Sequence, residues 1–241
     1  MVRWTIAALL SLALVVAPIR RAAAVTCAPP VGADVRLRDI DGRQRLLWIY
    51  RRLDDEAARG RLWSRAWAIG IGTAGVASLV PVPFVAGGDR VDWYASAVTA
   101  AVGVIPFVVS PLAVTRDGPR LGASVAALGP MPDDQVPVCA VLADAERMLA
   151  ADAADERWNQ GWWIHAGNLA FNTAVLLFLG LGYHHWTSGI INGVSGAVVG
   201  ETIIFTQPTA TIADVAAYNR GELPAGDGGR RAFGLGYRAA F

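Results

Sequence analysis

Long apolar stretches separated by short polar links dominate the chain beyond residue 65. Four windows of 23 residues contain no lysine, arginine or aspartate, and they cover residues 66–88, 93–115, 161–183 and 186–208. About 20 apolar residues in a helix cross the hydrocarbon core of a bilayer, so each window is long enough to span a membrane. Seven of the nine tryptophans lie at or near window ends, where an interfacial aromatic belt would be.

The links inside each pair of windows are short: residues 89–92 in the first pair, and His184 and His185 in the second. Such links predict antiparallel helical hairpins. We therefore predict an all-α membrane protein with four transmembrane helices in two tandem hairpins. Buried helices of a soluble bundle are the alternative, and an outer-membrane β-barrel is disfavoured because the apolar windows are continuous.

The two hairpins resemble each other, which predicts an internal duplication. Four residues of the first align without gaps on four of the second: Trp63, Trp67, Ile69 and Gly72 on Trp158, Trp162, Ile164 and Gly167. An amphipathic helix is expected before each hairpin, from apolar residues at helical spacing: Leu46, Ile49, Tyr50, Leu53 and Ala57, and Val138, Val141, Leu142, Ala145 and Leu149. Chance alignment of alanine-rich helices is the alternative. The expected domains are repeats at 25–115 and 116–208 and a flexible tail at 209–241.

The first 24 residues have the layout of a secretory signal peptide: Arg3, an apolar run, and small residues at 22–24. An uncleaved anchor helix is the alternative. Cleavage would place the large loops outside a bacterial inner (plasma) membrane, on the periplasmic side. Residues 25–65 argue against this, because they carry nine arginines against six acids and positive segments favour the cytoplasm.

The two cysteines, Cys27 and Cys139, each head one predicted repeat. An even pair in an oxidising compartment predicts a disulfide between them. Two unpaired thiols are the alternative, and we expect no metal at either cysteine.

Polar residues inside the apolar windows are costly and need an explanation. His165, Asn168 and Asn172 share one face of the third window, and Glu201 of the antiparallel fourth window is expected at a similar depth. Such a cluster can join helices by hydrogen bonds, relay protons, or act as acid and base. The fourth window also carries a stripe of small residues that favours close helix packing: Gly189, Gly193, Gly196 and Gly200.

Composition removes other classes of function. Only 17% of residues are charged, all 21 basic residues are arginine, and the net charge is +1, which disfavours a nucleic-acid binder. We identify no nucleotide-binding, metal or catalytic motif, and expect no cofactor. The expected function is a non-catalytic component of a membrane assembly, held in a homo- or hetero-oligomer within the lipid bilayer through helix packing on the glycine stripe. A small transporter or proton relay using His165 and Glu201, and a membrane-embedded enzyme acting on lipid, are the alternatives.

Overall fold

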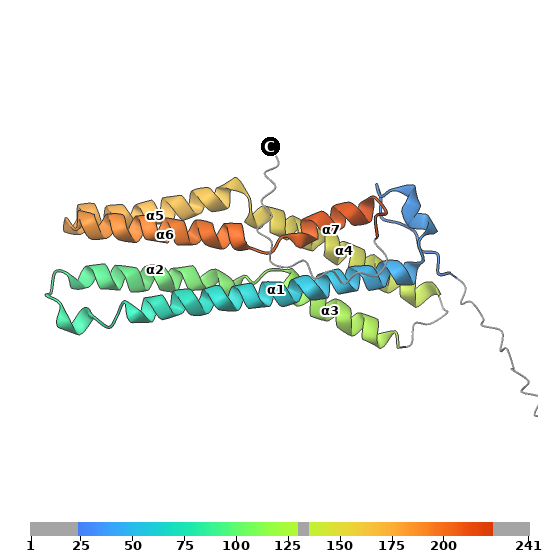
Figure 1. Ribbon diagram of the computed structural model, residues 1–241, viewed down its shortest axis with the longest axis horizontal. Coiled ribbons are helices and arrows are strands. Elements are labelled where there is room, and N and C mark those ends of the chain that lie inside the picture. The colour runs from blue at the N-terminus through green and yellow to red at the C-terminus, as the bar shows by residue number, and fades with distance from the viewer. Residues whose placement is uncertain (1–23, 130–134, 224–241) are drawn as a thin grey trace, which may run out of the picture.

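The computed structural model describes residues 24–129 and 135–223 (Figure 1). Regular secondary structure within these ranges is helical: η1 Val35–Asp39, α1 Gly42–Ala77, η2 Val82–Phe84, α2 Arg90–Val109, α3 Val114–Ala127, α4 Gln135–Asn159, α5 Trp162–Tyr183, α6 Trp186–Thr206 and α7 Ala210–Asn219. The expected signal peptide and the end of the expected tail lie outside the described residues.

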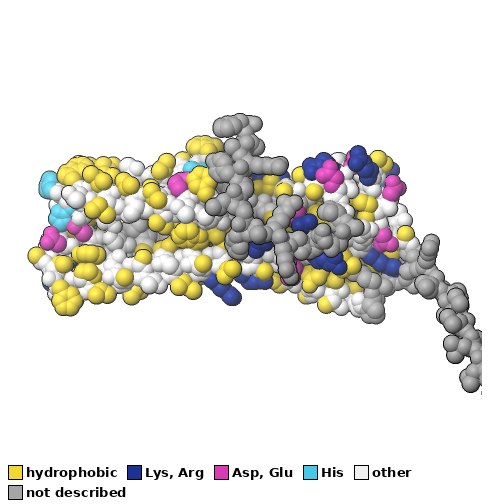
Figure 2. Space-filling model, viewed as in Figure 1, with side chains coloured by type: hydrophobic (Ala, Val, Ile, Leu, Met, Phe, Trp, Pro, Cys, Tyr) yellow, Lys and Arg dark blue, Asp and Glu magenta, His cyan; other side chains and the backbone are white. Residues whose placement is uncertain are grey.

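The molecule is elongated and has two parts, which we call the bundle and the head (Figure 1). In the bundle, the hairpin of α5 and α6 lies beside the hairpin of α2 and the second half of α1. The first half of α1 packs with α3, α4 and α7 to form the head. Charged side chains gather mainly over the head, while hydrophobic side chains cover much of the visible bundle surface (Figure 2).

Four helices are long and apolar enough to cross a membrane, which confirms the prediction of four spans. The second hairpin agrees closely with its predicted limits. In the first hairpin the predicted limits were wrong, because α1 ends at Ala77 and α2 begins at Arg90. Pro81 and Pro83 explain the long connection, since proline lacks an amide hydrogen and interrupts a helix.

α1 contains the first predicted amphipathic stretch and continues without a break into the first candidate span. Its 36 residues form one uninterrupted helix of about 54 Å, at 1.5 Å per residue. Leu46, Ile49 and Leu53 are fully buried in the head core, so their helical spacing serves packing against other helices. This stretch is therefore continuous with the first candidate span and packs inside the head.

The expected flexible tail was wrong for its first part, since residues 210–219 form α7. Tyr218 near the end of α7 is 1% exposed and belongs to the core of the head. On the other side of α1, Gly118 of α3 lies so close that a β-carbon there would be 2.8 Å from the Leu53 carbonyl oxygen. Apolar packing on α1 thus holds α3, and α7 completes the head against α4.

Candidate functional site

The four polar residues predicted in the second hairpin meet in the structure, and we call them the polar ladder. His165 Nδ1 lies 2.5 Å from Glu201 Oε2, and Asn168 Nδ2 donates to Glu201 Oε1 at 2.9 Å. Asn172 Nδ2 then donates to Asn168 Oδ1 at 2.8 Å. The ladder therefore runs along the interface of α5 and α6, with every member bonded to another.

The end of the ladder formed by His165 and Glu201 lies next to the head. His165 and Glu201 keep 27% and 25% of their side-chain surface exposed, whereas Asn172 is buried. The Phe205 ring lies 5.3 Å from the His165 ring, between centroids. The His–Glu pair is thus the accessible end, and Asn172 is the enclosed end.

The predicted glycine stripe faces this ladder. A β-carbon at Gly200 would overlap the Asn168 amide oxygen, and one at Gly196 would overlap the Asn172 amide oxygen. At Gly193 and Gly189 a β-carbon would lie 2.9 and 2.7 Å from backbone oxygens of α5. Small residues on α6 therefore make room for polar side chains and backbone of α5. The expectation that this stripe holds an oligomer together was wrong, because α5 of the same chain covers it.

A second set of polar contacts joins the two hairpins near their turns. His185 Nδ1 lies 2.8 Å from Asp92 Oδ1, and Ser188 donates to the other Asp92 oxygen at 2.6 Å. One turn further along α2, Ser96 donates to Asn192 Oδ1 at 2.6 Å. These bonds connect α2 to the beginning of α6, and the sequence pattern did not predict them because the partners lie more than 90 residues apart.

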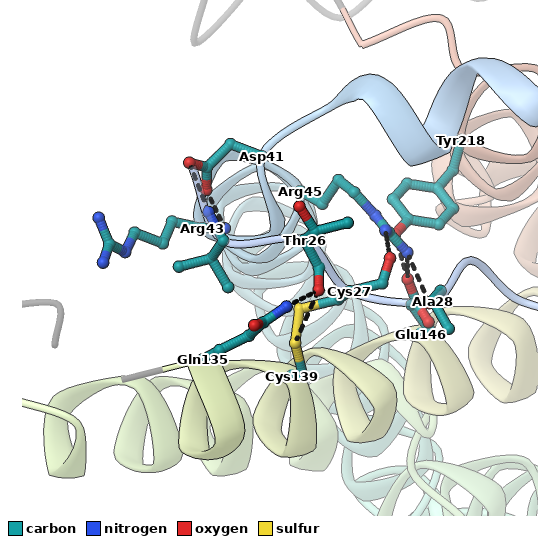
Figure 3. The surroundings of a disulfide bond; sticks show 11 residues. Thr26, Cys27, Ala28, Asp41, Arg43, Arg45, Gln135, Cys139, Glu146 and Tyr218 are labelled. Carbon is teal, nitrogen blue, oxygen red and sulfur yellow. Dashed lines mark hydrogen bonds and ion pairs between the residues drawn. A yellow bond between two sulfur atoms is a disulfide. The ribbon is translucent and has the colours of Figure 1, made fainter. Parts of the chain in front are cut away.

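The predicted disulfide is present: Cys27 and Cys139 are bonded, with their α-carbons 5.4 Å apart (Figure 3). Beside it lies the fully buried Arg45 of α1. Its guanidinium donates to the Cys27 carbonyl oxygen and to the Tyr218 hydroxyl, each at 2.9 Å, and forms an ion pair with Glu146. Tyr218 also donates to Glu146. Arg45 thus joins the amino-terminal segment, α1, α4 and α7.

Three buried carboxyl groups in the head were missed by sequence reasoning, and we call Glu56, Asp152 and Glu156 the acidic cluster. They are 1%, 1% and 2% exposed. Glu56 accepts from the Ala210 amide and Glu156 from the Ile212 amide, each at 3.1 Å, at the start of α7. Their sequence signal was their spacing. Glu56 lies inside the apolar stripe of α1, between Leu53 and Ala57, and Asp152 and Glu156 continue the stripe of α4 beyond Leu149 by one and two turns.

Burial shifts the titration of this cluster, which lies in the charged halves of α1 and α4 outside the apolar windows. Burial, reinforced by the Asp117 carboxylate of α3, raises the pKa of Asp152 to about 8. Burial likewise raises the pKa of Glu156 to about 8, although the hydrogen bond that it accepts from the Ile212 amide opposes the shift. Burial also raises the pKa of Glu56. At neutral pH, Asp152 and Glu156 are therefore mainly protonated.

Among the described residues, no group of three or more histidine, cysteine, aspartate or glutamate side chains is arranged so that it could hold a metal ion. Four membrane-length helices, arranged in two hairpins under a helical head, indicate a multi-pass membrane protein. Comparison of the chain with known protein families, curated proteins and solved structures finds no match. Function must therefore be argued from the geometry.

Proposed function

We propose that this protein is a non-catalytic component of a membrane assembly, in which two helical hairpins anchor a rigid head. The observation that carries the proposal is that the residues of the polar ladder join two helices of the bundle. Its side chains bond to one another between α5 and α6 and fit against the glycine stripe. Polar groups of this kind hold membrane helices together. The head then offers a folded surface outside the spans for a partner protein.

We also propose that the two hairpins and their head helices are repeats. Four buried residues of α1 correspond to four buried residues of α4, 96 positions later: Leu46, Ile49, Leu53 and Ala57 to Leu142, Ala145, Leu149 and Ala153. This register differs by one residue from the offset of 95 that aligns Trp63 with Trp158. A contact of the same kind in each half supports the proposal, made by acids that do not occupy equivalent positions. Glu56 of α1 accepts from the Ala210 amide of α7, and Asp155 of α4 accepts from the Ala113 amide before α3.

The head is proposed to face the periplasm, outside a bacterial inner membrane. The disulfide supports this side, because such bonds persist in oxidising compartments. Labelling of intact cells with a membrane-impermeant thiol reagent tests it. Labelling only after reduction is expected; labelling of broken cells without reductant would place the head in the cytoplasm.

The assembly itself is tested by the mass of the full chain extracted from its own membranes into lipid nanodiscs. The expected result is a particle containing more protein than one 25.4 kDa chain. A particle containing one chain and no partner, over the range of concentrations found in the membrane, contradicts the proposal.

Proton relay is the second candidate function, favoured by the 2.5 Å contact between His165 and Glu201. A carboxylate beside an imidazole can pass a proton between them. Glu201→Gln separates the two functions, because glutamine can keep the bond to Asn168 but cannot carry the proton. A structural ladder predicts unchanged proton flux in proteoliposomes and a stability loss of about 0.6 kcal/mol. A relay predicts loss of the flux, while Glu222→Gln in the exposed segment after α7 serves as the control.

A further inference from the structure

An apolar groove of about 410 Å³ lies between the two hairpins, along the facing sides of α2 and α5. Six of the side chains that line it are Tyr94, Val98 and Val102 of α2 and Phe171, Val175 and Phe178 of α5. Its volume is within the range of about 300–1,000 Å³ that is typical of small-molecule sites. The groove does not include the polar ladder, which lies between α5 and α6.

The groove exists because α2 is bonded to a different helix. Asp92 and Ser96 connect α2 to α6, on a face adjacent to the groove. No side-chain hydrogen bond between α2 and α5 is found among the described residues, and two small residues, Ala95 and Ala174, line the groove between them. The polar contacts thus hold α2 in place while leaving a channel beside α5 unfilled by protein.

The lining is suited to a hydrocarbon chain. Tyr94, Val98 and Phe178 are 50%, 62% and 52% exposed, although they lie within the candidate spans. The groove follows α2 from Val91 to Val102, which is about 16 Å along the helix axis at 1.5 Å per residue. A groove that runs along spanning helices is parallel to lipid tails in a bilayer.

The end of the groove near the hairpin turn carries one arginine, Arg90, between Asp89 and Asp92. Asp92 is already bound by His185 and Ser188. Arg90 begins α2, is exposed, and directly precedes Val91 of the lining. Arginine is well suited to bind a phosphate, through several donors in a planar arrangement. A lipid whose tail lies in the groove would place its phosphate at this level of the bundle.

We propose that the groove binds one acyl chain of a phospholipid, with the phosphate beside Arg90. The bound lipid would fill the space between the hairpins and serve as a structural part of the bundle. The proposal requires the four helices to span a bilayer, but it does not require the chain to be a subunit of an assembly. The two proposals therefore fail separately.

Photolabelling of the full chain in vesicles tests the proposal. The probes are a phosphatidylglycerol and a diacylglycerol, each with a diazirine in one acyl chain, in vesicles of phosphatidylethanolamine and phosphatidylglycerol. Phosphatidylglycerol labels are expected to concentrate on residues 91–102 and 171–178. Ala174→Phe, which fills the groove, should lower them about tenfold, since displacing about two methylene groups already costs that much.

Three further variants make the outcome decisive. Thr173→Phe places the same ring on an exposed neighbouring position at the same depth and should leave the labelling unchanged. Arg90→Gln should weaken labelling by phosphatidylglycerol but not by diacylglycerol. If the Ala174→Phe variant does not form the Cys27–Cys139 bond, the Ala95→Leu variant is tested in its place. The proposal is overturned if all four spans are labelled evenly, or if the labelling survives both groove-filling variants. It is also overturned if a second copy of the chain is crosslinked in the groove.

Discussion

The head and the bundle both enclose polar side chains, but they satisfy them in opposite ways. In the bundle, carboxylate, imidazole and amide groups meet as complementary donors and acceptors, as in the bonds of Glu201 with His165 and Asn168. In the head, Asp152 and Glu156 are buried close to other carboxyl groups. Neighbouring carboxyl groups that are buried away from water remain protonated, because two negative charges at close range would repel each other. The stability of the head should therefore depend on pH through a mechanism that the polar ladder lacks.

The largest expected effect of this difference is a loss of head stability as pH rises. Asp152 and Glu156 have ordinary pKa values of 3.8 and 4.5, and values of about 8 in the folded head. Between these limits the unfolded chain releases protons that the folded head retains, so the free energy of unfolding falls as pH rises from about 4 to 8. Each unit of difference is worth about 1.4 kcal/mol. Thermal unfolding in detergent, followed from pH 4 to 9, measures this slope.

Asp152→Asn should flatten part of that slope, because asparagine keeps the size of the side chain and has no proton to lose. Asp144→Asn is the matched control, since Asp144 lies on the same helix with half of its side chain exposed. A slope that is the same in the wild type and in Asp152→Asn would show that the acidic cluster does not control head stability.

The next largest effect is expected where the head does pair its charges. Arg45→Met removes the fully buried guanidinium and leaves Glu146 without its cation, which should cost about 3–5 kcal/mol of head stability. Arg147→Met breaks an exposed ion pair on α4 and should cost less than about 1 kcal/mol. Near-ultraviolet circular dichroism of the two variants during thermal unfolding compares them. Equal losses would mean that Arg45 contributes no more than a surface charge.

The smallest expected effect concerns the glycine stripe of the bundle. Gly196→Ala places a methyl group against the Asn172 amide oxygen and should cost about 1–3 kcal/mol through overpacking. Gly167→Ala on α5 is matched to it, because a β-carbon there meets no atom within 4 Å. That control should be neutral or stabilising by up to about 1 kcal/mol, since alanine favours the helix. Unfolding of both variants in mixed micelles measures the difference, and a similar stability for the two would contradict the close packing of α5 and α6.

Several features could be predicted because they depend on residues close in sequence. The four spans follow from the length of uninterrupted apolar windows, and the tight turn at His184 and His185 follows from the two residues between them. The disulfide followed from the count of cysteines, since two residues allow one pairing. The first hairpin was misjudged because Pro81 and Pro83 lie in an apolar run, where hydropathy outweighed the effect of proline on the helix.

The polar ladder shows how far such reasoning extends into the site. Its members could be chosen because an ionisable or amide side chain is costly in an apolar window, and hairpin geometry put Glu201 at the depth of His165. The bonds between Asp92 and His185 could not be chosen in the same way. They join different hairpins, and helical spacing within one segment contains no information on how two hairpins are placed side by side.

The sequence alone determined that the chain is helical, that it has four membrane-length helices, and which polar residues interrupt the second pair. These properties follow from local periodicity and from the cost of placing polar groups in hydrocarbon. Tertiary structure alone decided that Arg45 meets Glu146 and Tyr218, that the acidic cluster is buried, and that a groove separates α2 from α5. These features depend on packing between segments that are distant in sequence. A carboxyl group on a helix is exposed or buried according to which other helix packs against it.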